Sequence, residues 1–249
     1  MIRISNIHKS FHEGTTVIRV LEDFSLEIPE KQFLVIIGAN GSGKSTLLNI
    51  LAGTVFPESG KIKIGETELS KLPEYKRSNR IARIFQDPKM GTASELSLLE
   101  NFRLAFLRNE SKTLRIGTGK DFRKLVGMKV STLNLGLEQK LDQPMGTFSG
   151  GQRQALTLLM AVMTKPGILL LDEPTAALDP KTSVNIMETA DRIIRETGLT
   201  AILVTHQVKD AVRYGDRLIQ LSEGKIIRDI AGNEKKTLAP EQVLNRFSY

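Results

Sequence analysis

The sequence predicts an α/β fold built on a parallel sheet, with a helical segment inserted into it. Short apolar runs of strand length occur at residues 32–38, 167–172 and 200–206, and each leads into a helical pattern. Such alternation is typical of a mostly parallel sheet covered by helices. A longer, more polar helical stretch at about residues 95–165 separates the first run from the other two. We therefore expect a parallel α/β core that carries a helical subdomain.

The segment before the helical stretch contains the first strands of this fold. Residues 2–28 predict short strands around a turn, because alternating apolar residues flank a polar stretch that contains Gly14. The buried strand at 32–38 leads through a glycine-rich loop into a helix at 45–53, which ends at Gly53. A hairpin at 60–70 and a strand at 80–86 complete this half.

The helical stretch and the segment after it complete the expected order of elements. Gly127, Gly136 and Pro144 are expected to break the helices between residues 95 and 165. The pattern beyond predicts a strand at 167–172, a helix at 181–196, a strand at 200–206, a helix at 208–215 and strands within 216–227. The last residues are expected to form a short tail. The sequence contains no internal repeat or linker, so a single domain of residues 1–249 is predicted.

Residues Gly38-Ala39-Asn40-Gly41-Ser42-Gly43-Lys44-Ser45 match the phosphate-binding pattern G-x-x-x-x-G-K-[ST]. In such a loop the backbone N–H groups surround the phosphates and the Lys44 ammonium reaches the β- and γ-oxygens. The Ser45 hydroxyl binds Mg²⁺. A predicted strand precedes the loop and a predicted helix follows it, which is the context that this motif requires. The sequence therefore predicts a nucleoside triphosphate and Mg²⁺ as ligands.

Polar side chains follow several of the predicted strands. Asp172 and Glu173 end an apolar strand, where two carboxylates are costly unless they serve a cation or a reaction. Asp172 is expected to hold Mg²⁺, and Glu173 to polarise the attacking water. Gln86 offers an amide oxygen to Mg²⁺ or water, and the His206 imidazole could bind the γ-phosphate. Because open α/β sheets bind ligands at the carboxyl ends of their strands, these residues are expected to converge.

A second anion site is predicted at Phe148-Ser149-Gly150-Gly151-Gln152, just before an apolar helical pattern. Glycines let a backbone approach a ligand closely, and the first N–H groups of a helix are free to bind an anion. No nucleophile, base or metal ligand lies beside this segment in the sequence. The segment therefore indicates a phosphate site without indicating which phosphate it holds.

Composition excludes several classes of site and partner. The net charge is +7, but the Lys and Arg residues are dispersed and lack an aromatic stacking platform, so nucleic acid is not an expected direct partner. The absence of Cys excludes disulfides and thiolate metal sites. The first residues lack a continuous apolar stretch, so no secretory signal is expected, and no apolar run approaches the roughly 20 residues that span a bilayer. A cytosolic location is therefore expected.

In combination, these motifs resemble the ABC-type ATPases, the nucleotide-binding subunits of ATP-binding-cassette transporters. The resemblance covers essentially the whole chain and rests on the ordered motifs 38–45, Gln86, 148–152, Asp172-Glu173, 176–179 and His206. It implies the ABC ATPase fold: a phosphate-loop NTPase (RecA-like) core with an antiparallel β subdomain and a helical subdomain. Residues 1–90 and 165–249 would form the core and β subdomain, and residues 91–164 the helical subdomain with the signature motif.

The resemblance also implies roles for individual residues. Phe11 would stack on adenine, Val20 would line the same pocket, and Thr46 would join the loop in binding the nucleotide. Asp179 would belong to the loop that joins two catalytic sites. This chain has Phe148 where Leu is commoner in the family and Phe11 where Tyr is commoner, and both changes keep the apolar or stacking character. Residues 107–147 match the family least well.

The resemblance implies an assembly that explains the second anion site. Two copies would form a head-to-tail sandwich around ATP, in which Ser149 and the amides of Gly150 and Gly151 hold a γ-phosphate bound by the other copy. A membrane permease would dock on the segment after Gln86 and on the helical subdomain, which places the chain at the cytoplasmic face of the membrane.

The resemblance favours one function and leaves two alternatives open. A chain with one ATPase domain is most similar to importer subunits, which work with an exported solute-binding protein, and its overall pattern is similar to a group linked to amino-acid uptake. An ATPase of an exporter or extrusion complex is the first alternative. A soluble ABC ATPase that acts on the ribosome or on nucleic acid is the alternative of another class.

Overall fold

The computed structural model describes residues 1–107 and 117–246, and in these ranges the strands form two sheets. The first sheet is antiparallel with the order β2-β1-β4-β5. The second has the order β10-β9-β3-β8-β7-β6, parallel from β9 to β6, with β10 antiparallel at one edge. The strands are β1 Ile2–Glu13, β2 Thr16–Ile28, β3 Phe33–Gly38, β4 Ser59–Ile64, β5 Thr67–Glu68, β6 Ile81–Ile84, β7 Ile168–Asp172, β8 Thr200–Val204, β9 Arg217–Ser222 and β10 Lys225–Ala231.

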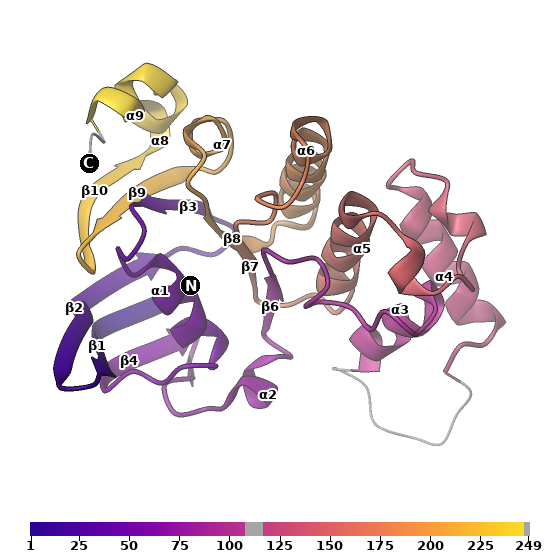
Figure 1. Ribbon diagram of the computed structural model, residues 1–249, viewed down its shortest axis with the longest axis horizontal. Coiled ribbons are helices and arrows are strands. Elements are labelled where there is room, and N and C mark those ends of the chain that lie inside the picture. Colours follow the sequence, from indigo (N-terminus) through magenta and orange to yellow (C-terminus); the bar gives the residue numbers. More distant parts are fainter. Residues whose placement is uncertain (108–116, 247–249) are drawn as a thin grey trace.

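The helices lie mainly around the parallel strands and at one end of the molecule. In Figure 1 the antiparallel sheet and helices α3 and α4 lie at opposite ends, with the parallel strands and helices α5 and α6 between them. The helices are α1 Lys44–Ala52, α2 Glu74–Arg77, α3 Leu98–Phe106, α4 Lys120–Ser131, α5 Gly150–Met163, α6 Pro180–Thr197, α7 Val208–Arg213, α8 Gly232–Lys236 and α9 Pro240–Arg246. The predicted α/β fold with a parallel sheet, an antiparallel sheet and added helices is confirmed.

Strand β3 separates two hydrophobic cores in the described part of the chain. All of its residues are buried, as expected for a parallel strand covered on both faces. Because successive side chains of a strand point to opposite faces, Val35 and Ile37 join the core beneath α5 and α6. Leu34 and Ile36 join the core shared with α1 and the antiparallel sheet. The same strand therefore anchors both halves of the molecule.

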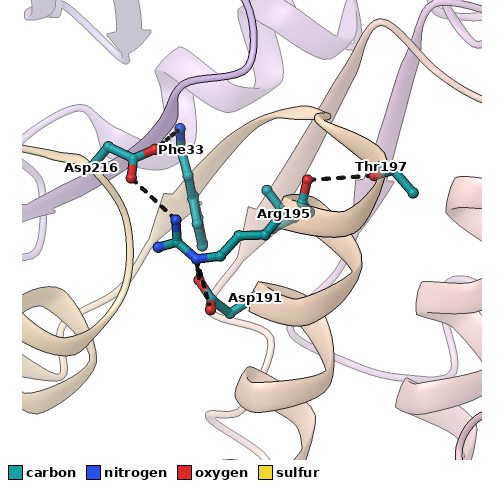
Figure 2. Close-up of polar contacts among 6 residues, drawn as sticks. Phe33, Asp191, Arg195, Thr197 and Asp216 are labelled. Carbon is teal, nitrogen blue, oxygen red and sulfur yellow. Dashed lines mark hydrogen bonds and ion pairs between the residues drawn. The ribbon is translucent and has the colours of Figure 1, made fainter.

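Polar contacts tie the amino end of the parallel sheet to helix α6. Figure 2 shows the Asp216 carboxylate between the Phe33 backbone and the Arg195 side chain. The Phe33 N–H donates to Asp216 Oδ2 at 3.0 Å, and Arg195 Nη1 lies 3.4 Å from Oδ1. Arg195 also donates through Nε to Asp191, one helical turn earlier, at 3.0 Å. These contacts join the start of β3, the end of α6 and the start of β9.

The ends of α1 and α6 agree with the sequence signals. Helix α1 ends at Gly53, which has a φ of 87°, a value that glycine adopts without strain. Helix α6 begins after Asp179, whose carboxylate accepts from the Thr182 N–H at 3.0 Å, and ends at Gly198. Both predicted helices are therefore confirmed within one or two residues.

Three expectations about local structure are wrong: the helix break at Gly127, the short first strands and the short tail at the end of the chain. Gly127 lies inside α4, where the buried Val126 and Val130 supply packing that offsets the cost of a helical glycine, about 1 kcal/mol. The first strands are long rather than short, with 12 residues in β1 and 13 in β2, and register shifts between the two strands let them continue.

The expected tail instead contains helices α8 and α9. Leu238 and Val243 are buried, and the buried Lys235 ammonium donates to the Val212 carbonyl oxygen of α7 at 2.6 Å. This apolar burial and the Lys235 hydrogen bond order a segment whose composition is polar overall. Of the segment 107–147 expected to depart from the family, residues 108–116 lie outside the described residues, and the remainder forms α4 and short turns.

Candidate nucleotide-binding site

The phosphate loop joins β3 to α1, as the sequence predicts. The backbone passes so close to β9 that a Cβ on Gly38 would lie 2.3 Å from the Leu221 carbonyl oxygen. Gly43 has a φ of 99°, a backbone conformation that residues other than glycine rarely adopt. Lys44 is buried, and its ammonium donates to the carbonyl oxygens of Gly38 and Ala39 at 2.7 Å each. The lysine thus lies within the curve of the loop, beside the first N–H groups of α1.

Lys44 also lies within electrostatic reach of the two acids at the end of β7. Burial lowers the pKa of Lys44 from its ordinary value, while the charges of Glu173 and Asp172 act in the opposite direction and raise it. The lysine and both carboxylates therefore gather at one edge of the sheet. This is the convergence that the strand ends predict.

Glu173 contacts His206 across neighbouring strands. The Glu173 N–H donates to the Val204 carbonyl oxygen at 3.0 Å, which extends the β7–β8 ladder by one residue. Its φ of 44° lies in the left-handed region, which costs on the order of 1 kcal/mol for a residue with a side chain. Glu173 Oε2 then lies 3.0 Å from His206 Nδ1. With a proton on Nδ1, the imidazole donates to the carboxylate, and only a second proton on Nε2 would give it a donor for an anionic ligand.

Asp172 contacts a cation that the sequence analysis did not single out. Arg83, on the neighbouring strand β6, donates through Nη2 to Asp172 Oδ2 at 2.5 Å and through Nη1 to Asn49 Oδ1 at 2.7 Å. Its guanidinium also lies over the Phe85 ring, 4.9 Å from the centroid. One Asp172 oxygen is thereby fixed, and the carboxylate is held between the strand edge and α1.

The residues at this edge fit a magnesium ion bound together with phosphate. Gln86 lines a cavity of about 630 Å³ with Asn49, Arg83 and Asp172. Carboxylate, amide and hydroxyl oxygens are ligands that Mg²⁺ accepts, and Ser45 supplies the hydroxyl in the first turn of α1. The described residues contain no group of three or more His, Asp or Glu side chains arranged for a metal. Mg²⁺ at this site would therefore depend on oxygens of the nucleotide, which is its usual behaviour.

The signature segment forms the start of α5. Ser149 and Gln152 cap each other: the Gln152 N–H donates to Ser149 Oγ at 3.3 Å, and the Ser149 N–H donates to Gln152 Oε1 at 3.1 Å. This capping box fixes the helix N-terminus, and the exposed Ser149 hydroxyl keeps its own proton for a ligand. In Figure 1 helices α1 and α5 lie on opposite sides of β7. The two predicted phosphate sites are therefore separate within one chain.

The remaining predicted site residues lie around this framework. The Val20 backbone adjoins the phosphate loop, because a Cβ on Gly43 would lie 3.1 Å from the Val20 carbonyl oxygen. Phe11 is 40% exposed near the β1–β2 turn, with the Lys9 ammonium 4.9 Å from its ring centroid. Thr46 is half-buried in α1, and Asp179 is the exposed N-cap of α6. The roles of all of these residues in binding remain predictions.

Two polar residues that connect parts of the site were missed. Gln154 on α5 is 1% exposed and donates to the carbonyl oxygens of Phe85 and Pro174, at 3.1 and 2.8 Å. It thereby joins the signature helix to the segments that follow β6 and β7. Arg83 and Gln154 share a signal in the sequence, since each is polar within a largely apolar run. Such residues need partners when buried, which is a reason to look for them.

The comparisons with known proteins identify the family. Residues 21–176 match the family model described as ABC transporter. The chain is 42% identical over 257 aligned positions to a tyrosine transport ATP-binding protein of Clostridioides difficile (strain R20291), covering 100% of this chain and 99% of that protein. The chain therefore belongs to the ABC transporter family, and it is an ATP-binding, ATP-hydrolysing subunit of a transporter.

Two further similarities support this assignment. A solved ATP-binding cassette, a dimer in a post-hydrolysis state bound to ADP and phosphate, matches with a TM-score of 0.80 and 30% identity. The match covers 93% of this chain and 98% of that one. A macrolide export ATP-binding/permease protein of Campylobacter fetus is 37% identical, covering 94% of this chain and 35% of that protein. Among the described residues, every helix is too short or too polar to cross a membrane.

Proposed function

We propose that this ATPase energises solute uptake through a membrane permease, as a head-to-tail dimer with two shared ATP sites. The observation that carries the proposal is the separation of the two anion sites within one chain. The phosphate loop adjoins Glu173 and Asp172, whereas the signature at the start of α5 lies on the other side of β7. A second copy turned head-to-tail brings its signature to this phosphate loop, so each ATP lies between the two copies.

The chemistry follows from the positions of Glu173 and His206. Glu173 accepts a proton from the water that attacks the γ-phosphorus, while the bond from that phosphorus to the β–γ bridging oxygen breaks and ADP leaves. His206, positioned through Nδ1 by Glu173, donates an Nε2–H to the γ-phosphate in its doubly protonated form. Ser45, Gln86 and Asp172 would hold Mg²⁺, which would neutralise phosphate charge when bound. Release of phosphate removes the contacts that hold the two copies together, and the dimer opens.

A surface between Gln86 and α3 supports docking of a permease. A cavity of about 360 Å³ lies between the segment after β6 and helices α3 and α5. Met90 is 68% exposed and Leu104 is 50% exposed, and both line it. Apolar side chains exposed around a hollow favour an inserted apolar element of a partner, such as a short helix. Arg83 and Phe85 also line this cavity, so the docking surface adjoins the metal edge.

The solute and the direction of transport are inferred from relatives. The similarity to a tyrosine transport protein over the whole chain supports uptake of an amino acid, aromatic ones included. An importer of this kind works with an exported solute-binding protein and places the ATPase at the cytoplasmic face of the membrane. Export remains the competing direction, because one relative is a macrolide export protein.

Co-purification from the native cell tests the proposal. The tagged chain would be extracted with membranes in mild detergent, and the proteins that accompany it identified by mass spectrometry. A polytopic permease and an exported solute-binding protein are expected, and stimulation of ATPase activity by tyrosine with that binding protein would identify the solute. A permease with a large extracytoplasmic domain and no binding protein would establish export. Ribosomal or DNA-bound proteins without a permease would overturn the transporter function.

A further inference from the structure

The two glycines of the signature segment have different surroundings. Gly150 is exposed, and a Cβ on it would lie 3.4 Å from its nearest neighbour, Leu178 Cδ2. Gly151 is buried, and a Cβ on it would lie 2.2 Å from Thr182 Cγ2 in the first turn of α6. A separation of 2.2 Å is far inside van der Waals contact. An added methyl group therefore fits at the first glycine and not at the second.

The Thr182 backbone is fixed at the start of α6. The Thr182 N–H donates to Asp179 Oδ1 at 3.0 Å. Hydrogen bonds from the Thr182 side chain and from its backbone hold the pKa of Asp179 below its usual range. Of the Thr182 side-chain atoms, Cγ2 lies nearest to a Cβ on Gly151, ahead of Cβ at 3.5 Å and Oγ1 at 3.7 Å, so the methyl group is directed at Gly151. Asp179, Thr182 and Gly151 thus form a continuous series of contacts from the α6 cap to the α5 cap.

We propose that Gly151 and Thr182 are positioning residues, whose close contact fixes the signature segment to the start of α6. Gly151 is needed because only hydrogen leaves room for the Thr182 methyl group, and Gly150 is needed for the open side that faces a ligand. The signature and Asp179 then move as one unit. This inference rests on the proposed function in one respect: both segments face the second copy, so the contact sets the alignment of the dimer.

Paired substitutions separate packing from ligand binding. In a Gly151→Ala, Thr182→Ser chain, the nearest remaining atom to the new Cβ is Thr182 Cβ, 3.5 Å away, because the serine lacks Cγ2. Serine also keeps a hydroxyl at this position, and the backbone N–H that donates to Asp179 is unchanged. The series is therefore Gly151→Ala, Thr182→Ser, the double variant, and Gly150→Ala as the matched control. Each is measured as the full chain by thermal unfolding and by ATP-driven dimerisation in a Glu173→Gln background.

The contact between Gly151 and Thr182 predicts a specific pattern of Tm values and dimerisation strengths. Gly151→Ala should lower the Tm by roughly 5 °C through overpacking, and the double variant should lie within about 2 °C of Thr182→Ser. Gly150→Ala should keep the wild-type Tm. Dimerisation should weaken about tenfold in Gly151→Ala and recover in the double variant.

Three outcomes would overturn the inference. If Gly151→Ala unfolds at the wild-type Tm, or if the double variant keeps its full loss, Thr182 is not what Gly151 accommodates. If the Tm recovers but dimerisation does not, the contact packs the two helices without aligning the dimer. A Glu173→Gln chain that fails to dimerise with ATP would refute the proposed dimer instead. The Tm values of the variants would still test the contact between Gly151 and Thr182.

Discussion

Arg83 donates a hydrogen bond to Asp172 across the β6–β7 pair, with 2.5 Å between Nη2 and Oδ2. Each side chain is largely shielded from solvent, at 13% and 15% exposure, so the pair is held in a medium where charges interact strongly. The guanidinium also reaches Asn49 on α1. The acid proposed to serve Mg²⁺ is therefore oriented by a neighbouring strand and not by its own strand alone.

Removal of this cation should reduce stability and misplace Asp172. Arg83→Met leaves a partly buried carboxylate unpaired, which we expect to lower the free energy of unfolding by about 2 kcal/mol. Urea unfolding measures this change, and a Mg²⁺ titration of ATPase activity should give an altered half-saturating concentration. Arg83→Met with Asp172→Asn is the control, since it removes both charges and should recover part of the stability. An unchanged urea midpoint for Arg83→Met alone would contradict this role.

Arg77 should be among the most sensitive positions for stability. It is 0% exposed, and its guanidinium donates to carbonyl oxygens of Ile50 and Leu51 at the end of α1, at 2.5 and 2.9 Å, and of Leu72 at 2.6 Å. These acceptors lose a charged donor in Arg77→Met, so the free energy of unfolding should fall by about 3 kcal/mol. The exposed neighbour Lys76 provides the matched variant, Lys76→Met, which should change it by less than about 0.5 kcal/mol. Equal effects at the two positions would refute the argument.

Lys235 should make stability rise with pH in the alkaline range. Burial lowers its pKa to about 8 from an ordinary value of 10.5, against the opposing charge of Asp216. Between these values the unfolded chain keeps a proton that the folded chain has lost, so this group favours the folded state increasingly as pH rises. The wild type should therefore gain about 1 to 2 kcal/mol over Lys235→Met between pH 7 and pH 9.5. Urea unfolding of both at each pH checks this, and a constant difference would contradict it.

The proposed docking surface can be tested without affecting the ATP site. Leu104→Arg places a charge on the cavity beside Met90, so association with the co-purified permease should weaken by roughly tenfold or more. ATP hydrolysis by the isolated chain should stay at the wild-type rate. Val184→Arg, at another exposed apolar position on α6, is the control and should leave permease binding unchanged. Normal permease binding by Leu104→Arg would place the docking surface elsewhere.

Sequence patterns predicted the strands, the phosphate loop and the strand-end residues because each depends on local chemistry. The apolar run of β3 and the glycines beside Lys44 are consecutive in the sequence, so the local pattern is enough to predict their structure. Contacts between segments that are distant in the sequence leave no such local pattern, so the Arg83–Asp172 pair and the Gln154 bridge were missed. The tail was misread for a related reason: α8 and α9 are ordered by packing against α7, which their own polar composition does not indicate.

In the site, the residues could likewise be named from the sequence, whereas their orientations could not. Lys44, Glu173 and His206 could be named from motif and strand position, and their proximity follows from the parallel order of β3, β8 and β7. The orientation of Glu173 toward His206 depends on a left-handed backbone at Glu173, which no sequence rule indicates for glutamate. The different environments of Gly150 and Gly151 depend on where α6 crosses α5, which is a property of tertiary packing.

In the proposed cycle, two copies share each ATP and Glu173 is the base. Glu173→Gln keeps the shape of the side chain but cannot take a proton from water. Sedimentation of this variant with and without ATP and Mg²⁺ tests the dimer, and phosphate release from the same samples tests the base. We expect a monomer without ATP, a stable dimer with one ATP per subunit, and almost no phosphate release. A chain that stays monomeric with ATP bound, or that hydrolyses ATP at the wild-type rate, would contradict it.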